Sequence, residues 1–155
     1  MLNDLYERDN IAGFPQVVPN GTQPGVIVPF MQVDGAYLQR NISCIDQDPY
    51  YGGVLFGADH AYFIGEKDLS YQITTYDLGA NVDTYIEIWY FDKSTAMIQQ
   101  LLGAMDDDSG PGLGSQVTFQ APESTRYYVK IYNWNILDSM PGTSYKVTVT
   151  NQSLQ

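Results

Sequence analysis

The residues best suited to chemistry in this 155-residue sequence are carboxylates gathered in short clusters. The densest cluster is Asp106-Asp107-Asp108, which runs into Ser109-Gly110 and a glycine-rich stretch. Three adjacent carboxylates repel one another and raise each other's pKa values, and a bound Ca²⁺ would relieve that repulsion. The alternative is a solvated acidic turn between strands. The spacing is not that of an EF-hand, since no glutamate stands at its twelfth position, so calcium binding needs further support.

Other oxygen ligands are grouped near the N-terminus and in the middle of the chain: Glu7, Asp9, Asn10, Asp46, Asp48 and Asp59. Side chains on separate loops can converge at one end of a β-sandwich. The sequence leaves open which of these groups do so.

A candidate binding surface lies in residues 126–134 (RYYVKIYNW), which read as a β-strand. Side chains alternate between the two faces of a strand. The set that we expect to face the core is Tyr127, Val129, Ile131 and Asn133. The opposite face then aligns three aromatic side chains on the outside: Tyr128, Tyr132 and Trp134. Exposed aligned aromatics suit sugar rings or an extended peptide, unless a loop or another strand covers them.

The sequence contains no recognisable catalytic set. Nucleophilic or general acid–base catalysis usually needs a base beside the reacting group, and the only histidine is His60. The motifs of serine hydrolases, zinc proteases and P-loop proteins are absent. We therefore predict that the protein is not an enzyme and that His60 is a surface residue of a strand.

The charge balance excludes two classes of partner. The formal net charge is −11, from 18 acidic and 7 basic residues. Such a field repels phosphate backbones and anionic lipid head groups, so we expect no nucleic-acid binding. No apolar run approaches the ~18 residues of a membrane span, so we expect no membrane insertion. Acidity instead favours cations, although solubility alone would also explain it.

Strand-like runs alternate with glycine, aspartate and asparagine turns from Asp34 onward. The predicted strands are residues 36–42, 53–56, 61–65, 69–76, 82–91, 95–101, 116–120, 126–134 and 144–150. Many short strands without long helices predict an all-β fold, an antiparallel, jelly-roll-like β-sandwich in a single domain. Residues 94–102 (STAMIQQLL) could instead form a helical turn or two. We divide the chain into an N-terminal acidic and uncharged extended segment, 1–34, and a sandwich domain, 35–155.

Period-2 alternation divides the side chains of three of these strands between two faces. The residues that share one face are Tyr71, Ile73 and Thr75, then Val82, Thr84, Ile86, Ile88 and Tyr90, then Tyr145, Val147 and Val149.

A series of short motifs also follows in a characteristic order, at residues 7–10, 59–63, 71–75, 83–89, 106–110, 115–122, 127–133 and 145–149. Their order and spacing resemble the bacterial pre-peptidase C-terminal domain, a family that includes the collagen-binding domains of clostridial collagenases. Each motif alone is weak, but together they extend over most of the predicted sandwich. The resemblance implies a secreted β-sandwich that accompanies extracellular hydrolases and is not itself catalytic.

The resemblance also implies site residues. In the collagen-binding branch, calcium lies between the N-terminal acidic segment and the start of a D-x-D strand. The matching ligands here are Glu7, Asp9, Asn10 and Asp59. Ala61 stands where that motif has its second aspartate, so the acidic cluster 106–108 is an alternative or second site. The same branch binds its target through aromatics on the strand that matches Tyr132 and Trp134.

Together these observations predict a calcium-binding, non-catalytic module that is secreted or at the cell surface. It would bind a protein fibre or a polysaccharide through the aromatic side chains of residues 126–134 and could be accessory to a secreted peptidase. The alternative is a self-assembling subunit of an extracellular filament or surface layer. Its copies would join through calcium or by strand addition of the uncharged segment 10–33.

Overall fold

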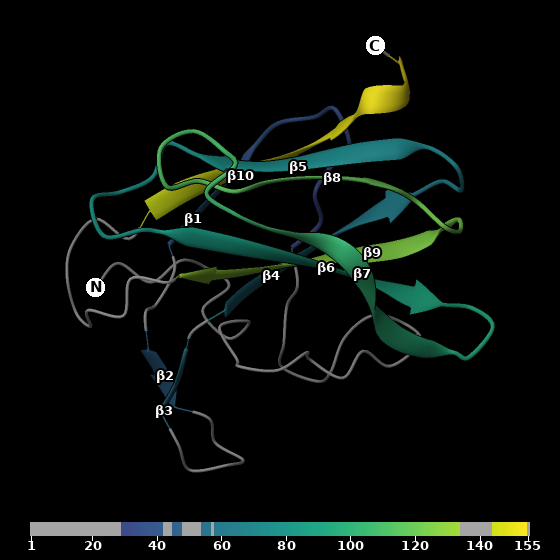
Figure 1. Cartoon of the computed structure of the whole chain (residues 1–155), viewed down its shortest axis with the longest axis horizontal. Coiled ribbons are helices and arrows are strands. Elements are labelled where there is room, and N and C mark those ends of the chain that lie inside the picture. Colours follow the sequence, from purple (N-terminus) through teal and green to yellow (C-terminus); the bar gives the residue numbers. More distant parts are fainter. Residues whose placement is uncertain (1–28, 42–44, 48–53, 57, 134–143, 155) are drawn as a thin grey trace.

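Two four-stranded antiparallel sheets pack face to face in the computed structural model, which describes residues 29–41, 45–47, 54–56, 58–133 and 144–154 (Figure 1). The first sheet contains, in spatial order, β1 (Leu38–Asn41), β10 (Ser144–Asn151), β5 (Ser70–Tyr76) and β8 (Gln116–Gln120). The second contains β4 (Ala58–Gly65), β9 (Thr125–Asn133), β6 (Thr84–Asp92) and β7 (Met97–Asp107). A separate pair joins β2 (Ile45–Gln47) to β3 (Val54–Phe56).

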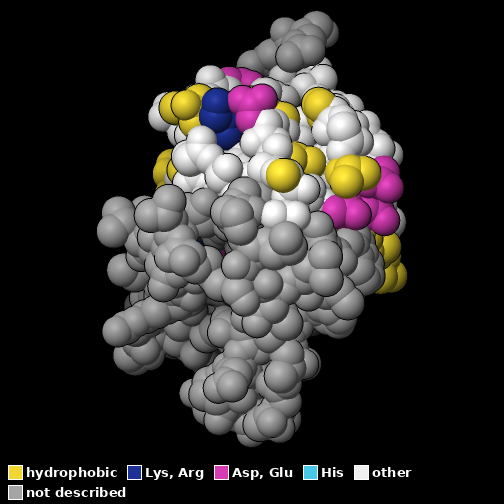
Figure 2. Space-filling model, turned by 90° about the vertical axis from the view of Figure 1, so that its left-hand side faces the viewer, with side chains coloured by type: hydrophobic (Ala, Val, Ile, Leu, Met, Phe, Trp, Pro, Cys, Tyr) yellow, Lys and Arg dark blue, Asp and Glu magenta, His cyan; other side chains and the backbone are white. Residues whose placement is uncertain are grey.

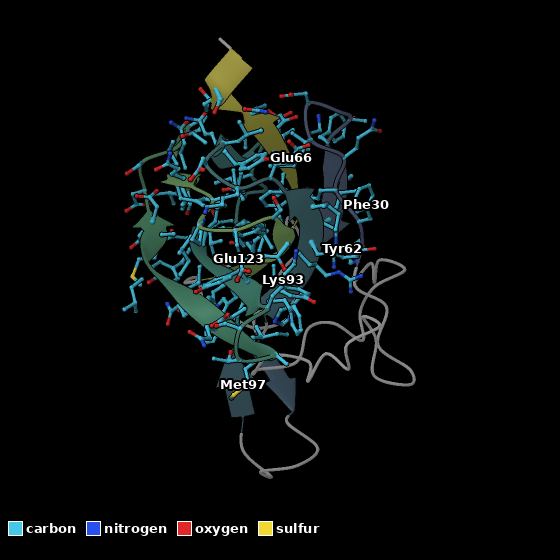
Figure 3. The ribbon with its side chains drawn as sticks, turned by 90° about the vertical axis from the view of Figure 1, so that its right-hand side faces the viewer. Phe30, Tyr62, Glu66, Lys93, Met97 and Glu123 are labelled. Carbon is cyan, nitrogen blue, oxygen red and sulfur yellow. The ribbon has the colours of Figure 1, made fainter. Side chains whose placement is uncertain are left out.

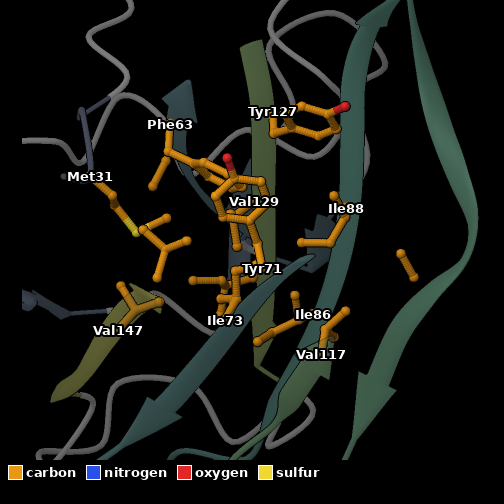
Figure 4. Packing of buried hydrophobic residues seen from close by; sticks show 14 of the residues in the cluster. Met31, Phe63, Tyr71, Ile73, Ile86, Ile88, Val117, Tyr127, Val129 and Val147 are labelled. Carbon is orange, nitrogen blue, oxygen red and sulfur yellow. The ribbon is translucent and has the colours of Figure 1, made fainter. Parts of the chain in front are cut away.

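The core lies between the two sheets because apolar side chains alternate along their strands. Strands β5 and β10 show strict alternation of buried and partly buried residues. Figure 4 shows the centre of this core, where Phe63 of β4 stacks on Tyr127 of β9 with ring centroids 5.6 Å apart. Phe63 also packs against Tyr71 and Phe119 of the opposite sheet. Aromatic side chains from both sheets thus fill the centre of this core.

The predicted all-β sandwich is confirmed. The residues that alternation grouped on one face of β5, β6 and β10 are the ones that point into the core, although Tyr90 is only partly buried. Residues 97–102 belong to strand β7 and not to a helix. Among the described residues, the only helical element is the 3₁₀ turn Gln152–Leu154, and no helix is long and apolar enough to cross a membrane.

The bounds of several strands differ from the prediction. Strand β7 continues to Asp107, beyond the predicted end at 101, because it pairs with the whole of β6. The short strand β2 was not predicted. In addition, Met31 is buried in the core cluster, and Phe30 forms a parallel bridge with Tyr62 of β4.

Candidate metal centre

Three carboxylates meet at one end of the second sheet. Asp83 stands immediately before β6, Asp107 ends β7, and Asp108 follows with a left-handed φ of 63°. One ligand oxygen from each of the three lies within 4.8 Å of the other two. Two oxygens that each bind one Ca²⁺ at 2.3–2.6 Å can be at most about 5 Å apart, so this spacing suits a shared cation.

The electrostatics of this cluster favour a positive ligand. The pKa of Asp83 is raised, first by burial and then by the negative charges of Asp108 and Asp107. The pKa of Asp107 is raised by burial and by its neighbours Asp108 and Asp106. In addition, Asp83 is partly buried, and its inaccessible Oδ1 accepts no hydrogen bond from the described part of the chain. A buried carboxylate oxygen without a donor is costly, and a metal ion is one partner that would remove that cost.

The position of Asp83 is fixed from β9. Asn133, the buried last residue of β9, accepts a hydrogen bond at 3.0 Å through Oδ1 from the Asp83 backbone N–H. Its Nδ2 donates at 3.1 Å to the carbonyl of Asn81. One amide side chain therefore holds both ends of the short segment that presents the Asp83 carboxylate.

The loop after Asp108 is held by a buried cluster of hydroxyl groups. Thr75 Oγ1 and Thr84 Oγ1 share a hydrogen bond of 2.6 Å, and the Ser115 backbone N–H donates to Thr75 Oγ1 at 2.8 Å. Gly114 fits here because a Cβ at this position would lie 2.5 Å from the Thr75 carbonyl oxygen. The Thr84 N–H also donates to the Leu113 carbonyl at 3.2 Å, so the loop is tied directly to the start of β6.

Asp106, which the sequence placed among the metal ligands, points into this loop instead. Its Oδ2 accepts from the backbone N–H groups of Ser109 at 3.0 Å and Gln116 at 2.9 Å. Its Oδ1 accepts from the Ser109 hydroxyl at 2.5 Å. The prediction of a three-aspartate turn is therefore wrong in detail, because Asp106 and Asp107 are strand residues that point in different directions.

Asp59, the fourth ligand implied by the resemblance, links the two sheets. Its Oδ1 lies 3.5 Å from Arg40 Nη2 of β1, and its Oδ2 accepts a hydrogen bond from the Tyr145 hydroxyl of β10 at 2.5 Å. A guanidinium already neutralises this carboxylate, which disfavours a second cation there. We therefore leave Asp59 out of the candidate metal centre.

His60 and Tyr128 are buried, whereas the sequence predicted that both lie at the surface. His60 is fully buried in β4, and its carbonyl accepts a hydrogen bond from Arg40 Nη1 at 3.2 Å. Tyr128 does face away from the core between the sheets, as alternation predicted, but it is only 1% exposed. Its ring centroid lies 6.4 Å from that of Tyr62, which is in turn 5.3 Å from that of Phe30 (Figure 3). The second sheet's outer face is thus partly covered, which is the alternative considered for these aromatics.

The remaining predicted site residues divide into two groups. Tyr132 is partly exposed, and its ring centroid lies 6.0 Å from that of Tyr85. Four residues lie outside the described residues: Glu7, Asp9, Asn10 and Trp134.

Asp83 was not among the candidate ligands named from the sequence. It stands directly before a strongly alternating strand, as turn aspartates often do, and nothing local distinguishes it. The signal was in the strand order, because β6 and β7 are antiparallel neighbours and the start of one lies beside the end of the other. On the face shown in Figure 2, acidic side chains gather in a patch that borders hydrophobic side chains.

Comparison with known proteins identifies the fold. No family model matches the chain, and no curated protein sequence matches it significantly. Among the solved structures that are similar to the chain are the following three. The pre-peptidase C-terminal domain of collagenase from Bacillus anthracis has a TM-score of 0.50 at 15% identity, over 79% of this chain and 94% of that domain.

The second is CorA, a surface-associated copper-binding protein of Methylomicrobium album BG8, with a TM-score of 0.57 at 10% identity, over 81% of this chain and 98% of that one. The third is PliG of Aeromonas hydrophila, a periplasmic inhibitor of g-type lysozyme, with a TM-score of 0.50 at 15% identity, over 81% and 95%. The predicted resemblance to the pre-peptidase C-terminal domain is therefore confirmed for the fold.

Proposed function

We propose that this chain is a non-catalytic, exported β-sandwich module that binds Ca²⁺ at Asp83, Asp107 and Asp108 and holds an extracellular protein fibre or polysaccharide. The observation that carries the proposal is the meeting of these three carboxylates within 4.8 Å of one another, beside an inaccessible Asp83 Oδ1 that accepts no hydrogen bond from the described residues. The absence of a recognisable catalytic set in the sequence supports the non-catalytic part. The surface-associated and periplasmic descriptions of two structural neighbours support export.

Calcium suits this donor set better than the copper bound by one structural neighbour. The cluster offers carboxylate oxygens, which are hard ligands and favour Ca²⁺ or Mg²⁺. Copper prefers thiolate, thioether or imidazole ligands. Calcium also tolerates irregular geometry with water in open positions, whereas Mg²⁺ requires a near-ideal octahedron. A site built from two strand ends and a turn favours the more tolerant ion.

We expect 1 mM Ca²⁺ to raise the melting temperature above that in chelator, by about 5–10 °C if this concentration is about 100 times the Kd. Asp83→Asn should abolish the calcium-dependent rise, because it removes the buried anionic ligand. In chelator the same variant should melt at or above the wild-type temperature, since it also removes repulsion from Asp107 and Asp108. The measurement is a thermal scan of each protein with calcium and with chelator.

The matched control is Glu66→Gln, an isosteric change at an exposed position in the turn before β5. It should keep the full calcium-dependent rise. A wild-type melting temperature that is equal in calcium and in chelator, together with no heat of calcium binding by calorimetry, would rule out the proposed site.

A second candidate function is self-assembly, and the edge of the second sheet favours it. Strand β7 has no partner on its outer side among the described residues, and Met97 to Met105 carry no charge. Leu102 is 86% exposed and Met97 is 63% exposed on this edge. Uncharged exposed edges are templates for pairing between chains. If assembly is the function, light scattering should show a mass that rises with concentration, whereas a strict monomer in calcium and in chelator excludes it.

A further inference from the structure

We propose that two copies of this chain join along β7 about a two-fold axis and form a closed dimer, with Leu102 at the contact. This inference rests on the second candidate function, self-assembly, and assigns it a dimer instead of an open filament. It does not depend on the calcium site, so the two proposals can fail separately.

Strand β7 is a long open edge of the sandwich. With 11 residues it is the longest described strand, and no described strand lies on its outer side in the second sheet (Figure 1). Strands β1 and β8, which border the first sheet, have only four and five residues. Very short edge strands offer little backbone for pairing, whereas a long uncharged edge is a template for it. A second copy can therefore pair better with β7 than with either edge of the first sheet.

The other edge of the second sheet is already occupied. In β4, the Tyr62 N–H donates to the Pro29 carbonyl at 3.0 Å, and the Tyr62 carbonyl accepts from the Met31 N–H at 2.7 Å. The His60 carbonyl accepts from Arg40 Nη1 at 3.2 Å. A filament that continues this sheet from copy to copy needs two open edges on each copy. Because the centre of β4 already has its partners, pairing that extends this sheet joins β7 to the β7 of a second copy.

A bulge in β7 exposes the contact residue. Residues 101–104 lie opposite the one β6 residue between Glu87 and Trp89. Leu102 belongs to this bulge and is 86% exposed, and Gly103 follows with a left-handed φ of 83°. A bulge interrupts the backbone ladder that a neighbouring strand can form, so side chains must supply much of the contact. An apolar side chain as exposed as Leu102 gains free energy when a second copy removes it from water.

The charge distribution favours antiparallel pairing of two copies. Residues 94–105 carry no charge in a chain of net charge −11, so two copies repel each other little along this stretch. The acidic residues 106–108 follow at one end. A two-fold axis makes the two β7 strands antiparallel, which separates their acidic ends by roughly 20 Å, the length of the strand. That distance is about twice the Debye length in physiological salt, so the repulsion between these ends is screened.

The first experiment measures the mass of the full chain by light scattering after size exclusion, over a range of concentrations in calcium and in chelator. We expect a mass that rises with concentration and levels off at twice that of one chain. Leu102→Asp should weaken the dimer at least about tenfold, because it replaces an apolar contact by a charge that faces its own copy. The matched control is Ile64→Asp, at a position of β4 that is 51% exposed, and it should leave the dimer unchanged. Circular dichroism checks that both variants fold.

Cysteine cross-linking tests the two-fold axis itself. Cys44→Ser removes the only native cysteine. In that background, Leu102→Cys should give a covalent dimer under mild oxidation, because a two-fold axis brings the same residue of both copies together. Ile64→Cys in the same background should remain uncross-linked.

The outcomes separate the dimer from self-assembly in general. Masses that grow beyond twice that of one chain overturn the closed dimer and leave self-assembly standing. A dimer that Leu102→Asp does not weaken, with no cross-link at position 102, overturns the role of β7. A strict monomer in calcium and in chelator overturns self-assembly and this inference together, and the calcium site is then decided by calorimetry alone.

Discussion

Replacing Asp59 by alanine should lower the free energy of unfolding by about 3–5 kcal/mol, the usual cost of breaking a buried ion pair from one side. Arg40 and Asp59 are both almost completely inaccessible to solvent, and Asp59 also accepts the Tyr145 hydroxyl. The variant would leave a guanidinium buried without its carboxylate. Because Arg40 and Tyr145 belong to the first sheet and Asp59 to the second, the contact between sheets would be lost as well. Urea unfolding followed by circular dichroism measures the change.

Two control variants show whether this loss of stability comes from the buried ion pair. Asp77→Asn removes the charge that pairs with Lys146 at a site where the aspartate is 62% exposed, keeps a residue that tolerates the left-handed φ of 49°, and should cost less than about 1 kcal/mol. The double variant Arg40→Met, Asp59→Leu should recover much of the loss, because apolar replacement of a whole buried pair is often nearly neutral. If instead the cost of Asp59→Ala appeared only in calcium and vanished in chelator, Asp59 would be a calcium ligand as the resemblance implied.

The faces of the strands could be predicted because burial and alternation come from the same cause. A strand with one side on the core needs apolar residues at every second position, and Tyr145, Val147 and Val149 show this without any knowledge of the partners. The same reasoning placed Tyr127 and Val129 inside the sandwich. The sandwich class therefore follows from local patterns together with the shortness of the runs.

The covered outer face could not be predicted in this way. Alternation says which side chains share a face, but it does not say whether a second layer lies over that face. Tyr128, Lys130 and His60 all point away from the space between the sheets, and all three are nearly inaccessible. Burial lowers the pKa of Lys130, and the nearby Glu87 carboxylate opposes this shift. Such contacts join residues far apart in the sequence, so no local pattern reports them.

For a related reason, only two of the three residues of the candidate metal centre were predicted from the sequence. Asp107 and Asp108 are conspicuous because they are adjacent, whereas Asp83 joins them only through the pairing of β6 with β7. Adjacency was also misleading, because consecutive strand residues point to opposite faces. Asp106 and Asp107 are consecutive residues of β7, so their side chains point to opposite faces and do not meet on one cation. The pairing of strands, not the density of charge, decides which carboxylates meet.

The second large effect is expected at Asp106, which shapes the loop after Asp108 and is not one of the three clustered carboxylates. Asp106→Ala should weaken Ca²⁺ binding by roughly 10- to 100-fold, the usual cost of losing a residue that orients metal ligands. The variant removes the acceptor for Ser109 N–H, Ser109 Oγ–H and Gln116 N–H, which together shape the loop that follows Asp108. The carboxylates of Asp107 and Asp108 would stay in the chain but lose their fixed spacing. Isothermal titration calorimetry with CaCl₂ measures the affinity.

Asp106→Asn distinguishes positioning from direct ligation. The amide oxygen can accept from both backbone N–H groups, and the amide nitrogen can donate to the Ser109 hydroxyl, so the loop should keep its shape. Calcium affinity should then fall less than about fivefold, because loss of one exposed charge costs under about 1 kcal/mol. If Asp106 were itself a ligand, the asparagine variant would lose affinity about as severely as alanine. Asn in place of Asp at position 83 should show that severe loss, because it removes one of the three carboxylates that would contact the cation directly.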